Sequence, residues 1–137
     1  MSNPDGPWFV DAPIARTFGL EVLEVDREAG RIVVAFAAGP EYVNAHGRVQ
    51  GGILATMLDA TMGPALRATL AEGQWAPSTD LHVRFLAPAV PGRFVGRGHV
   101  VRRGGTIAFT EASLEDATGA VVATASGTSV LRGPTRD

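Results

Sequence analysis

Residues 79–87 alternate between apolar and polar side chains, the period-two pattern of a β-strand with one buried face. Later stretches are rich in Val, Thr, Phe and Ile, and glycine-containing turn sequences at 103–105 and 116–119 separate them. Two shorter strand-like pieces come earlier and flank the turn sequence 28–30. The sequence therefore predicts strands at 20–25, 31–36, 79–87, 93–103, 106–115 and 120–131.

One long segment between the early and late strands has a different pattern. From Ile53 to Leu70 the sequence reads as a helix whose apolar positions cover most of its circumference. We therefore expect this helix to be buried on nearly all sides. Pro64 leaves the carbonyl of Ala60 without its helical donor and, with Gly63 beside it, predicts a kink or break.

The order of the elements predicts the architecture. Four late strands are joined by short turns, and short connections make consecutive strands antiparallel neighbours. The economical arrangement is an α+β fold, a single antiparallel sheet wrapped around the long helix. The first twenty residues form a short lead-in, where Asp11-Ala12-Pro13 predicts a cap and first helical turn. No repeat or linker divides the chain, so residues 1–137 are expected to form one domain.

The composition excludes several classes of function. Of 137 residues, 45% are hydrophobic and 19% charged, which is ordinary for a globular domain. The net charge of −2, with no basic run longer than Arg102-Arg103, argues against a nucleic-acid partner. There is no cysteine, which excludes disulfides, thiol nucleophiles and thiolate metal sites. The N-terminus lacks a basic region, and the apolar stretch 49–66 is interrupted, so we expect a cytoplasmic protein with no membrane segment.

The long apolar segment holds the most conspicuous candidate for chemistry. Between Arg48 and Arg67 the only ionisable residue is Asp59, and the segment opens with the pair Gly51-Gly52. Glycines at a helix start leave backbone N–H groups unpaired and unshielded, where the helix dipole favours a developing oxyanion. This combination fits a catalytic carboxylate facing a polarised carbonyl. The alternatives are a glycine pair that only permits close packing, and a buried acid bonded to Ser or Thr hydroxyls.

The spacing of these groups has a consequence for assembly. Asp59 lies eight residues beyond Gly51, which is roughly 12 Å along a helix at about 1.5 Å per residue. A base or nucleophile must come within about 3 Å of its target. Asp59 therefore cannot serve a carbonyl held by Gly51 of its own chain, but it could serve one held by a second chain whose helix runs antiparallel beside it. The spacing predicts a dimer with two shared sites.

A set of motifs resembles the hotdog-fold acyl-CoA thioesterases, most closely the PaaI-like branch of the phenylacetic acid pathway. The resemblance covers about residues 15–131 and is carried by Asp59, the stretch 78–88 and, above all, the block Asn44-x-x-Gly47-x-x-Gln50-Gly51-Gly52. It implies a hotdog fold, hydrolysis of acyl-CoA to a free acid and CoA without a cofactor, and a homotetramer with the dimer as catalytic unit. That family most often has histidine where this chain has Gln50, which can donate a hydrogen bond but cannot shuttle a proton at neutral pH.

The resemblance also implies roles for residues outside the helix. Ser78 occupies a position where the family often has a hydroxyl that helps to hold the attacking water; Thr79 could do so instead, or both could simply begin a strand. Asn44 could contact substrate together with Gly52, but a role in fixing its own loop is favoured for Asn44. The phosphates of CoA could meet arginines on the later strands, with Gly104 and Gly105 allowing close approach, or these arginines could be solvated; they are Arg93, Arg97, Arg102 and Arg103.

Two alternatives to a thioesterase stay open. A hotdog hydratase or dehydratase resembles this chain at Asn44-Ala45-His46 but needs a histidine with an acid close by. A non-catalytic acyl-CoA or fatty-acid-binding module is favoured by Gln50 and disfavoured by Asp59. None of the histidines has a metal-binding spacing, and His82 is expected on a solvated face with Asp80 and Arg84. The residues that could shape an acyl cavity are Trp8, Phe9 and Trp75.

Overall fold

The computed structural model describes residues 12–134, which form two helices, a short 3-10 helix and six strands. α1 begins at Pro13 after Ala12, as the first-turn proline predicts, whereas Asp11 lies outside the described residues. No helix among residues 12–134 is long and apolar enough to cross a membrane. In chain order the elements are α1 (Pro13–Thr17), β1 (Glu21–Asp26), β2 (Arg31–Ala38), η2 (Pro40–Tyr42), α2 (Gly51–Arg67), β3 (Ser78–Phe85), β4 (Gly92–Arg103), β5 (Ile107–Glu115) and β6 (Val121–Val130).

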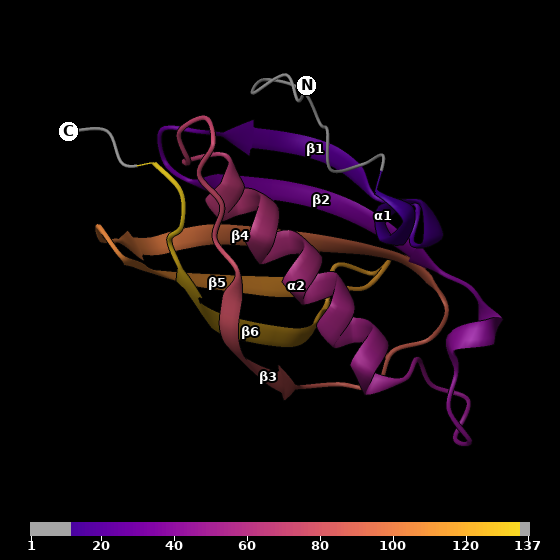
Figure 1. Ribbon diagram of the computed structural model, residues 1–137. Helices are drawn as coiled ribbons and strands as arrows, with labels where there is room; N and C mark the ends of the chain where they lie inside the picture. Colours follow the sequence, from indigo (N-terminus) through magenta and orange to yellow (C-terminus); the bar gives the residue numbers. More distant parts are fainter. Residues whose placement is uncertain (1–11, 135–137) are drawn as a thin grey trace.

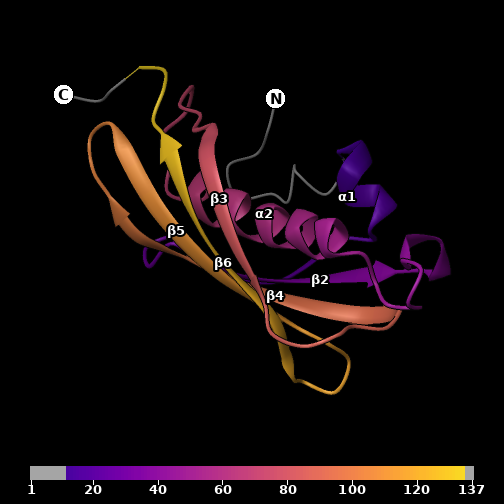
Figure 2. The same ribbon diagram turned by 90° about the horizontal axis from the view of Figure 1, so that it is seen from below.

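All six strands form one antiparallel sheet, and α2 lies across one face of it (Figures 1 and 2). The predicted α+β architecture, a single antiparallel sheet wrapped around one long helix, is confirmed. The strand order is β1-β2-β4-β5-β6-β3. The expectation that β3 and β4 are neighbours is wrong, because β2 and β5 occupy both sides of β4. The link 86–91 has to cross about three strand spacings, about 14 Å, which six extended residues can span.

α2 begins at the glycine pair and ends at Arg67, so the predicted helix of 53–70 starts two residues too late and ends three too late. Of the predicted kink or break at Pro64, the break does not occur, because the helix runs through Pro64 without interruption. Pro64 is half-buried and Gly63 beside it is exposed, so this side of the helix does not press on the sheet. The carbonyl of Ala60, which has no helical donor, is therefore tolerated there.

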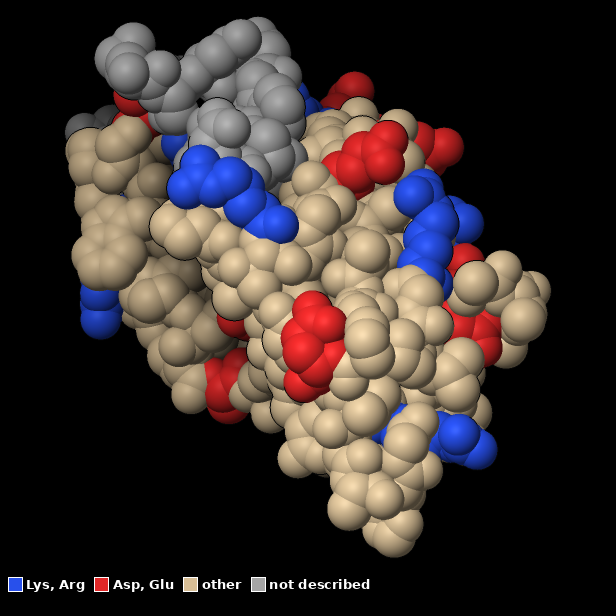
Figure 3. Space-filling model, turned by 90° about the vertical axis from the view of Figure 1, so that its right-hand side faces the viewer, with Lys and Arg blue, Asp and Glu red and all other residues tan. Residues whose placement is uncertain are grey.

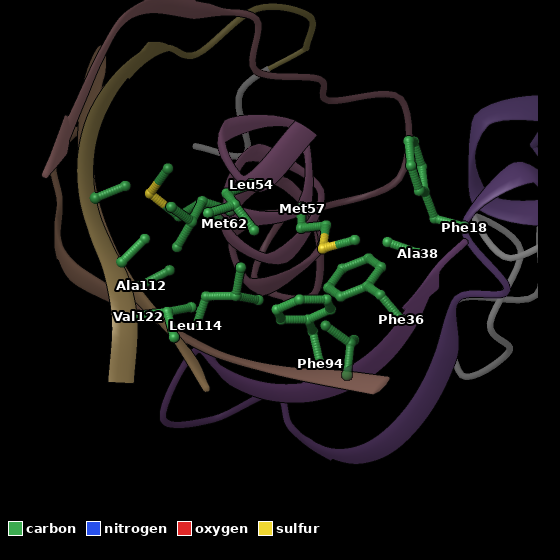
Figure 4. Close-up of a cluster of buried hydrophobic side chains, with 14 of the residues drawn as sticks. Phe18, Phe36, Ala38, Leu54, Met57, Met62, Phe94, Ala112, Leu114 and Val122 are labelled. Atoms are coloured by element: carbon green, nitrogen blue, oxygen red, sulfur yellow. The ribbon is translucent and has the colours of Figure 1, made fainter. Parts of the chain in front are cut away.

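The sheet covers one side of α2 and leaves another open. The expectation that the helix is buried on nearly all sides is wrong for the single chain, because Gly52, Asp59 and Gly63 are exposed. Figure 4 shows the covered side, where Met57 of α2 lies with Phe36 and Phe94 of the sheet in one hydrophobic cluster. The buried residues of the helix are Leu54, Met57, Leu58, Thr61, Met62, Ala65 and Leu66.

Two glycines of β4 let the helix approach the sheet closely. A Cβ atom at Gly98 would lie 2.9 Å from Cγ2 of Thr61, and one at Gly96 would overlap the Thr61 hydroxyl. Thr61 is fully buried and donates its hydroxyl proton to the carbonyl of Met57, at 2.8 Å, so it presents no unpaired polar group to the sheet. This contact fixes the position of the middle of α2, and with it the position of the exposed Asp59 on the other side.

Candidate active site

The start of α2 has free backbone donors. The carbonyl of Gln50 accepts hydrogen bonds from the N–H groups of Ile53 (2.9 Å) and Leu54 (3.3 Å). The N–H groups of Gly51 and Gly52 have no acceptor among residues 12–134. The side chain of Gln50 is exposed and does not cap the helix. Two unpaired donors therefore point out of the positive end of the helix dipole, as the glycine pair predicts.

The two glycines differ in their surroundings. A Cβ atom at Gly51 would lie 3.1 Å from Cζ of Phe85 in β3, whereas a Cβ atom at Gly52 would meet nothing within 4 Å. The packing explanation therefore holds for Gly51 but not for Gly52. Close packing at Gly51 is compatible with a role in binding, because the packing involves the Cα side of the residue and leaves its backbone N–H free.

Asn44 shapes the loop that leads into the helix. Its Oδ1 accepts hydrogen bonds from the N–H groups of His46 (2.9 Å) and Arg48 (3.2 Å), and its own N–H donates to the carbonyl of Arg48 (2.7 Å). Gly47 completes this tight loop with a φ of 75°, which other residues rarely adopt. This is the loop-fixing role that the sequence favoured for Asn44.

Asp59 lies exposed on the open side of α2, with no hydrogen-bond or ion-pair partner among residues 12–134. The hydroxyls of Thr56 and Thr61 donate to helix carbonyls instead, at 2.9 and 2.8 Å. Within the single chain, Asp59 is therefore not a buried acid bonded to Ser or Thr hydroxyls. Partial burial nevertheless raises the pKa of the Asp59 carboxyl above its ordinary 3.8. A desolvated, unpartnered carboxylate is available as a base or nucleophile.

The hydroxyls of Ser78 and Thr79 have different environments. The register shifts between Ser78 and Asp80, which is a β-bulge, and Thr79 donates its hydroxyl proton to the carbonyl of Thr128 at 3.3 Å. Ser78 lies opposite the buried Ser129 and so shares its face of the sheet, the face that α2 covers. The Ser78 hydroxyl has no partner among residues 12–134, so of the two hydroxyls it is the one that is free.

β3 runs beside α2 in the opposite direction. Its last residue, Phe85, contacts Gly51, whereas Leu81 pairs with Gly127, whose neighbour on the helix is Met62. Ser78 therefore belongs with the C-terminal half of α2. Within one chain the structure does not bring Ser78 or Asp59 to Gly51.

The four candidate arginines differ in what they already bind. Arg97 pairs with Glu115 at 2.9 Å, and Arg93 with Glu21 at 3.7 Å. Arg103 donates to the carbonyl of Thr69 and to Oε1 of Gln74, at 3.2 and 3.0 Å. Of the four, only Arg102 has no partner among the described residues, so it is the one left free for a ligand.

Arg102 and the hairpin after it lie near the end of α2. Arg102 pairs with the exposed Phe109, on the sheet face turned away from the helix, while Arg103 pairs with the buried Ala108. Gly104 closes the hairpin, its N–H donating to the carbonyl of Ile107 at 2.8 Å. Because Arg103 reaches Thr69, this hairpin is at the opposite end of α2 from Gly51.

The outer face of the sheet carries a groove of about 920 Å³ that crosses the strands. His82 and Arg84 line it, as their predicted solvated positions allow, and His99 faces Glu111 at 3.5 Å within it. Among residues 12–134 no three acids or histidines are placed to hold a metal ion. The surface in Figure 3 is mostly uncharged, with separate small groups of acidic and basic side chains.

The aromatic residues proposed to shape an acyl cavity are only partly described. Trp75 is 58% exposed and forms a backbone bridge with Arg132 near the end of β6, and Trp8 and Phe9 lie outside the described residues. Sequence reasoning missed Phe85 as a site residue. The alternation of residues 79–87 predicts the face of the sheet on which Phe85 lies, but its contact with Gly51 depends on the order of the strands in the sheet.

Comparison with known proteins identifies the family. The sequence model of the Thioesterase superfamily matches residues 46–123. The chain belongs to this superfamily. This hotdog thioesterase is 33% identical over 101 residues to human acyl-coenzyme A thioesterase 13, covering 72% of this chain and 71% of that one. The hotdog fold of this superfamily is the sheet and helix described above.

Solved structures agree with this assignment. A phenylacetic acid degradation-related protein from Ralstonia eutropha JMP134 superposes with a TM-score of 0.83 at 35% identity, covering 87% of this chain and 90% of that one. A Bacillus halodurans protein solved with CoA superposes with a TM-score of 0.69 at 27% identity, covering 72% and 70%. The predicted PaaI-like resemblance is confirmed.

Proposed function

We propose that this hotdog thioesterase hydrolyses an acyl-CoA to a free carboxylic acid and CoA. The observation that carries the proposal is the pair of unpaired N–H groups at Gly51 and Gly52, together with an unpartnered Asp59 whose pKa is raised. The human relative's name and the CoA bound to the Bacillus halodurans structure support acyl-CoA as the substrate class.

In the proposed reaction, the thioester carbonyl oxygen binds at the helix start and gains stabilisation as it becomes an oxyanion. Loss of one such donor typically costs about 10²–10³ in rate. Asp59 either removes a proton from the attacking water or attacks the carbonyl carbon itself. The tetrahedral intermediate then collapses and expels the CoA thiolate, which takes up a proton. With Asp59 as base, this step yields the free acid. With Asp59 as nucleophile, it leaves a mixed anhydride between the acyl group and Asp59, and water hydrolyses that anhydride to the free acid and the Asp59 carboxylate. Ser78 holds the water, and the amide of Gln50 donates a hydrogen bond to substrate or loop.

The proposed site needs two chains. α2 is continuous from Gly51 to Asp59, so these residues stay roughly 12 Å apart along one helix. The open side of α2 and the unpaired edge of β3 are both available to a second copy, and Leu81, Phe85 and Leu86 at this edge are exposed apolar residues. Two β3 edges could pair and extend the sheet, with the two helices antiparallel.

That arrangement completes the site from both chains. A partner helix that runs antiparallel and is shifted along its axis would bring the middle of one α2, with Asp59, and the start of its β3, with Ser78, beside the start of the other α2, with Gln50 and Gly51. The free Arg102 lies near the same end of α2 but on the outer face of the sheet, so it could meet the phosphates of CoA only outside the helix interface. The family resemblance adds the expectation that two such dimers form a homotetramer.

The first test is Asp59→Asn, assayed by trapping the free thiol released from a panel of acyl-CoAs. We expect turnover to fall at least about 10²-fold, the lower scale for loss of a general base, with fold and dimer unchanged. Near-normal turnover would rule out Asp59. Wild-type protein that binds acyl-CoA but releases no thiol would instead support a binding module. Single-turnover hydrolysis in ¹⁸O-water separates the two roles, because only a nucleophilic Asp59 acquires label.

The second test addresses the shared site. Inactive Asp59→Asn subunits are mixed with inactive Gly51→Val subunits and allowed to exchange. Each mixed dimer then has one site with both lesions and one with neither, so activity should return. A mixture that exchanges subunits yet stays inactive would contradict the shared site, and so would an active monomer.

A further inference from the structure

Phe85 occupies the space where a side chain of Gly51 would be. Its ring atoms Cζ and Cε1 lie 3.1 and 3.3 Å from the position of a Cβ atom at Gly51. The Cα–Cβ bond of a helical residue tilts toward the helix N-terminus. A ring in this position therefore lies next to the free N–H groups of Gly51 and Gly52, on the side of the helix that faces β3.

The other part of the ring is open. Phe85 is 55% exposed although one part of it rests against Gly51, and the ring is held in place because β3 pairs with β6 as far as Phe85 and Ala123. The N–H of Leu86, the next residue, donates to the carbonyl of Val122 at 2.9 Å. The backbone on both sides of the ring is thus fixed, and in the single chain the outward surface of the ring is exposed and can contact a ligand held at the helix start.

We propose that Phe85 is a specificity-determining residue that selects an apolar acyl group by packing against its first carbons. This inference rests on the proposed function, because it places the thioester carbonyl at the N–H groups of Gly51 and Gly52. A carbonyl oxygen bound there has its acyl carbon within van der Waals reach of the ring. An acetyl group offers one methyl to this surface, whereas a hexanoyl group offers several methylenes, and burial of each of them favours binding.

The test compares hexanoyl-CoA with acetyl-CoA as substrates. We expect Phe85→Ala to lower the ratio of the two kcat/KM values by at least about 10-fold, the low end of discrimination by a hydrophobic pocket. Leu86→Ala is the matched control, because Leu86 is 57% exposed and adjacent, whereas the three atoms nearest to the Gly51 Cβ position all belong to Phe85. Its ratio should stay within about 3-fold of wild type. A Phe85→Ala ratio equal to that of wild type would overturn the proposal, as would an equal change in Leu86→Ala.

A second experiment tests the contact itself. Gly51→Ala keeps the backbone N–H but places a methyl group 3.1 Å from the ring, so the ring has to move. The chain-length ratio should therefore fall in Gly51→Ala, and Gly51→Ala should not change it further when Phe85 is already Ala. An equal fall in both backgrounds would mean that Gly51 acts without Phe85, and the proposal would be wrong.

Two controls separate this inference from its premises. Phe85→Leu keeps the β3 edge apolar, and light scattering on each variant reports whether the oligomer is intact; a ratio that follows the oligomer rather than the ring contradicts the proposal. If wild type released no thiol from either substrate, the proposed function would fail by itself. Calorimetric binding of the thioethers hexyl-CoA and ethyl-CoA would then decide on Phe85: the preference for hexyl-CoA should fall in Phe85→Ala, and an unchanged preference overturns the inference.

Discussion

The two ends of α2 are built in opposite ways. At the start, the N–H groups of Gly51 and Gly52 have no acceptor among the described residues. At the other end, carbonyls are satisfied: that of Leu66 accepts from the N–H and the hydroxyl of Thr69, at 2.9 and 2.7 Å, and Arg103 donates to the carbonyl of Thr69. The charge of Arg103 also suits the negative end of the helix dipole.

The difference indicates where stability and activity reside. A helix end whose polar groups are paired contributes to folding, while an end whose donors are left unpaired costs some stability and is available to bind an oxyanion. Substitutions at the end of α2 should therefore change stability with little effect on turnover. Substitutions at its start should do the reverse.

The largest expected effect on stability is at the satisfied end. Arg103→Ala removes two hydrogen bonds from a charged donor, to Thr69 and Gln74. Because Arg103 is exposed, its loss should lower the free energy of unfolding by about 1–1.5 kcal/mol, within the range for an ordinary hydrogen bond. Turnover per folded molecule should be unchanged. Urea denaturation and initial-rate assays measure the two quantities.

Arg102→Ala is the matched control for this prediction. Arg102 is adjacent and exposed but has no partner among the described residues, so its loss should leave the unfolding free energy within about 0.5 kcal/mol of wild type. If Arg102 binds a CoA phosphate, KM should rise in this variant while kcat is unchanged. Equal destabilisation by both substitutions would contradict the assigned role of Arg103.

A smaller effect is expected at the open end. Gln50 does not cap the helix, so Gln50→Ala should reduce turnover several-fold without loss of stability, and Gln50→His should retain more activity than Gln50→Ala because it keeps a donor. The pH–rate profile should be flat between about pH 6 and 8. A kinetic pKa in that range that disappears in His46→Ala would contradict this and favour hydratase-like chemistry.

Much of this comparison could be predicted from local sequence, because it depends on local features. Helix starts, turns and strand periodicity are set by neighbouring residues, and so the sequence predicts the helix near the glycine pair and most of the strand limits to within two residues. Features set by distant pairing were not. The bulge that makes Ser78 rather than Thr79 share the face of Ser129 requires the register with β6. The contact of Gly96 and Gly98 with Thr61, and that of Phe85 with Gly51, require the strand order.

The arginines illustrate the same limit. Arg93, Arg97, Arg102 and Arg103 look equivalent in the sequence as basic residues on strands. Their partners come from β1, β5 and the segment after α2, which only the folded sheet brings near. The face of α2 that carries Asp59 is a further case. Its apolar surroundings in the sequence indicated burial, but the sheet covers only the opposite side.

The smallest predicted effect concerns Asp59 on the exposed face of α2. It tests whether this unpaired group lowers stability, as the unpaired N–H groups at the helix start are expected to do. Because the folded-state pKa of Asp59 is raised by desolvation, the folded state binds this proton more tightly than the unfolded chain does. Stability from this group is therefore present below the ordinary pKa of 3.8 and is lost as pH rises through the raised value. Asp59→Asn does not titrate, so it should be more stable than wild type at pH 7.

Solvent screening keeps this gain below about 1 kcal/mol, and it should vanish near pH 3.5. Asp116→Asn provides a control of opposite sign. The hydroxyl of Thr118 donates to Asp116 at 2.6 Å and, with nearby backbone N–H groups, lowers the pKa of Asp116, so this variant should be less stable at pH 7 and lose that deficit as pH falls. Thermal unfolding of both variants between pH 3.5 and 7 measures the two slopes. If Asp59→Asn were destabilised at pH 7, Asp59 would be a structural residue that stabilises the helix. The exposed face of α2 would then resemble the end of the helix, where polar groups are paired, and not its start.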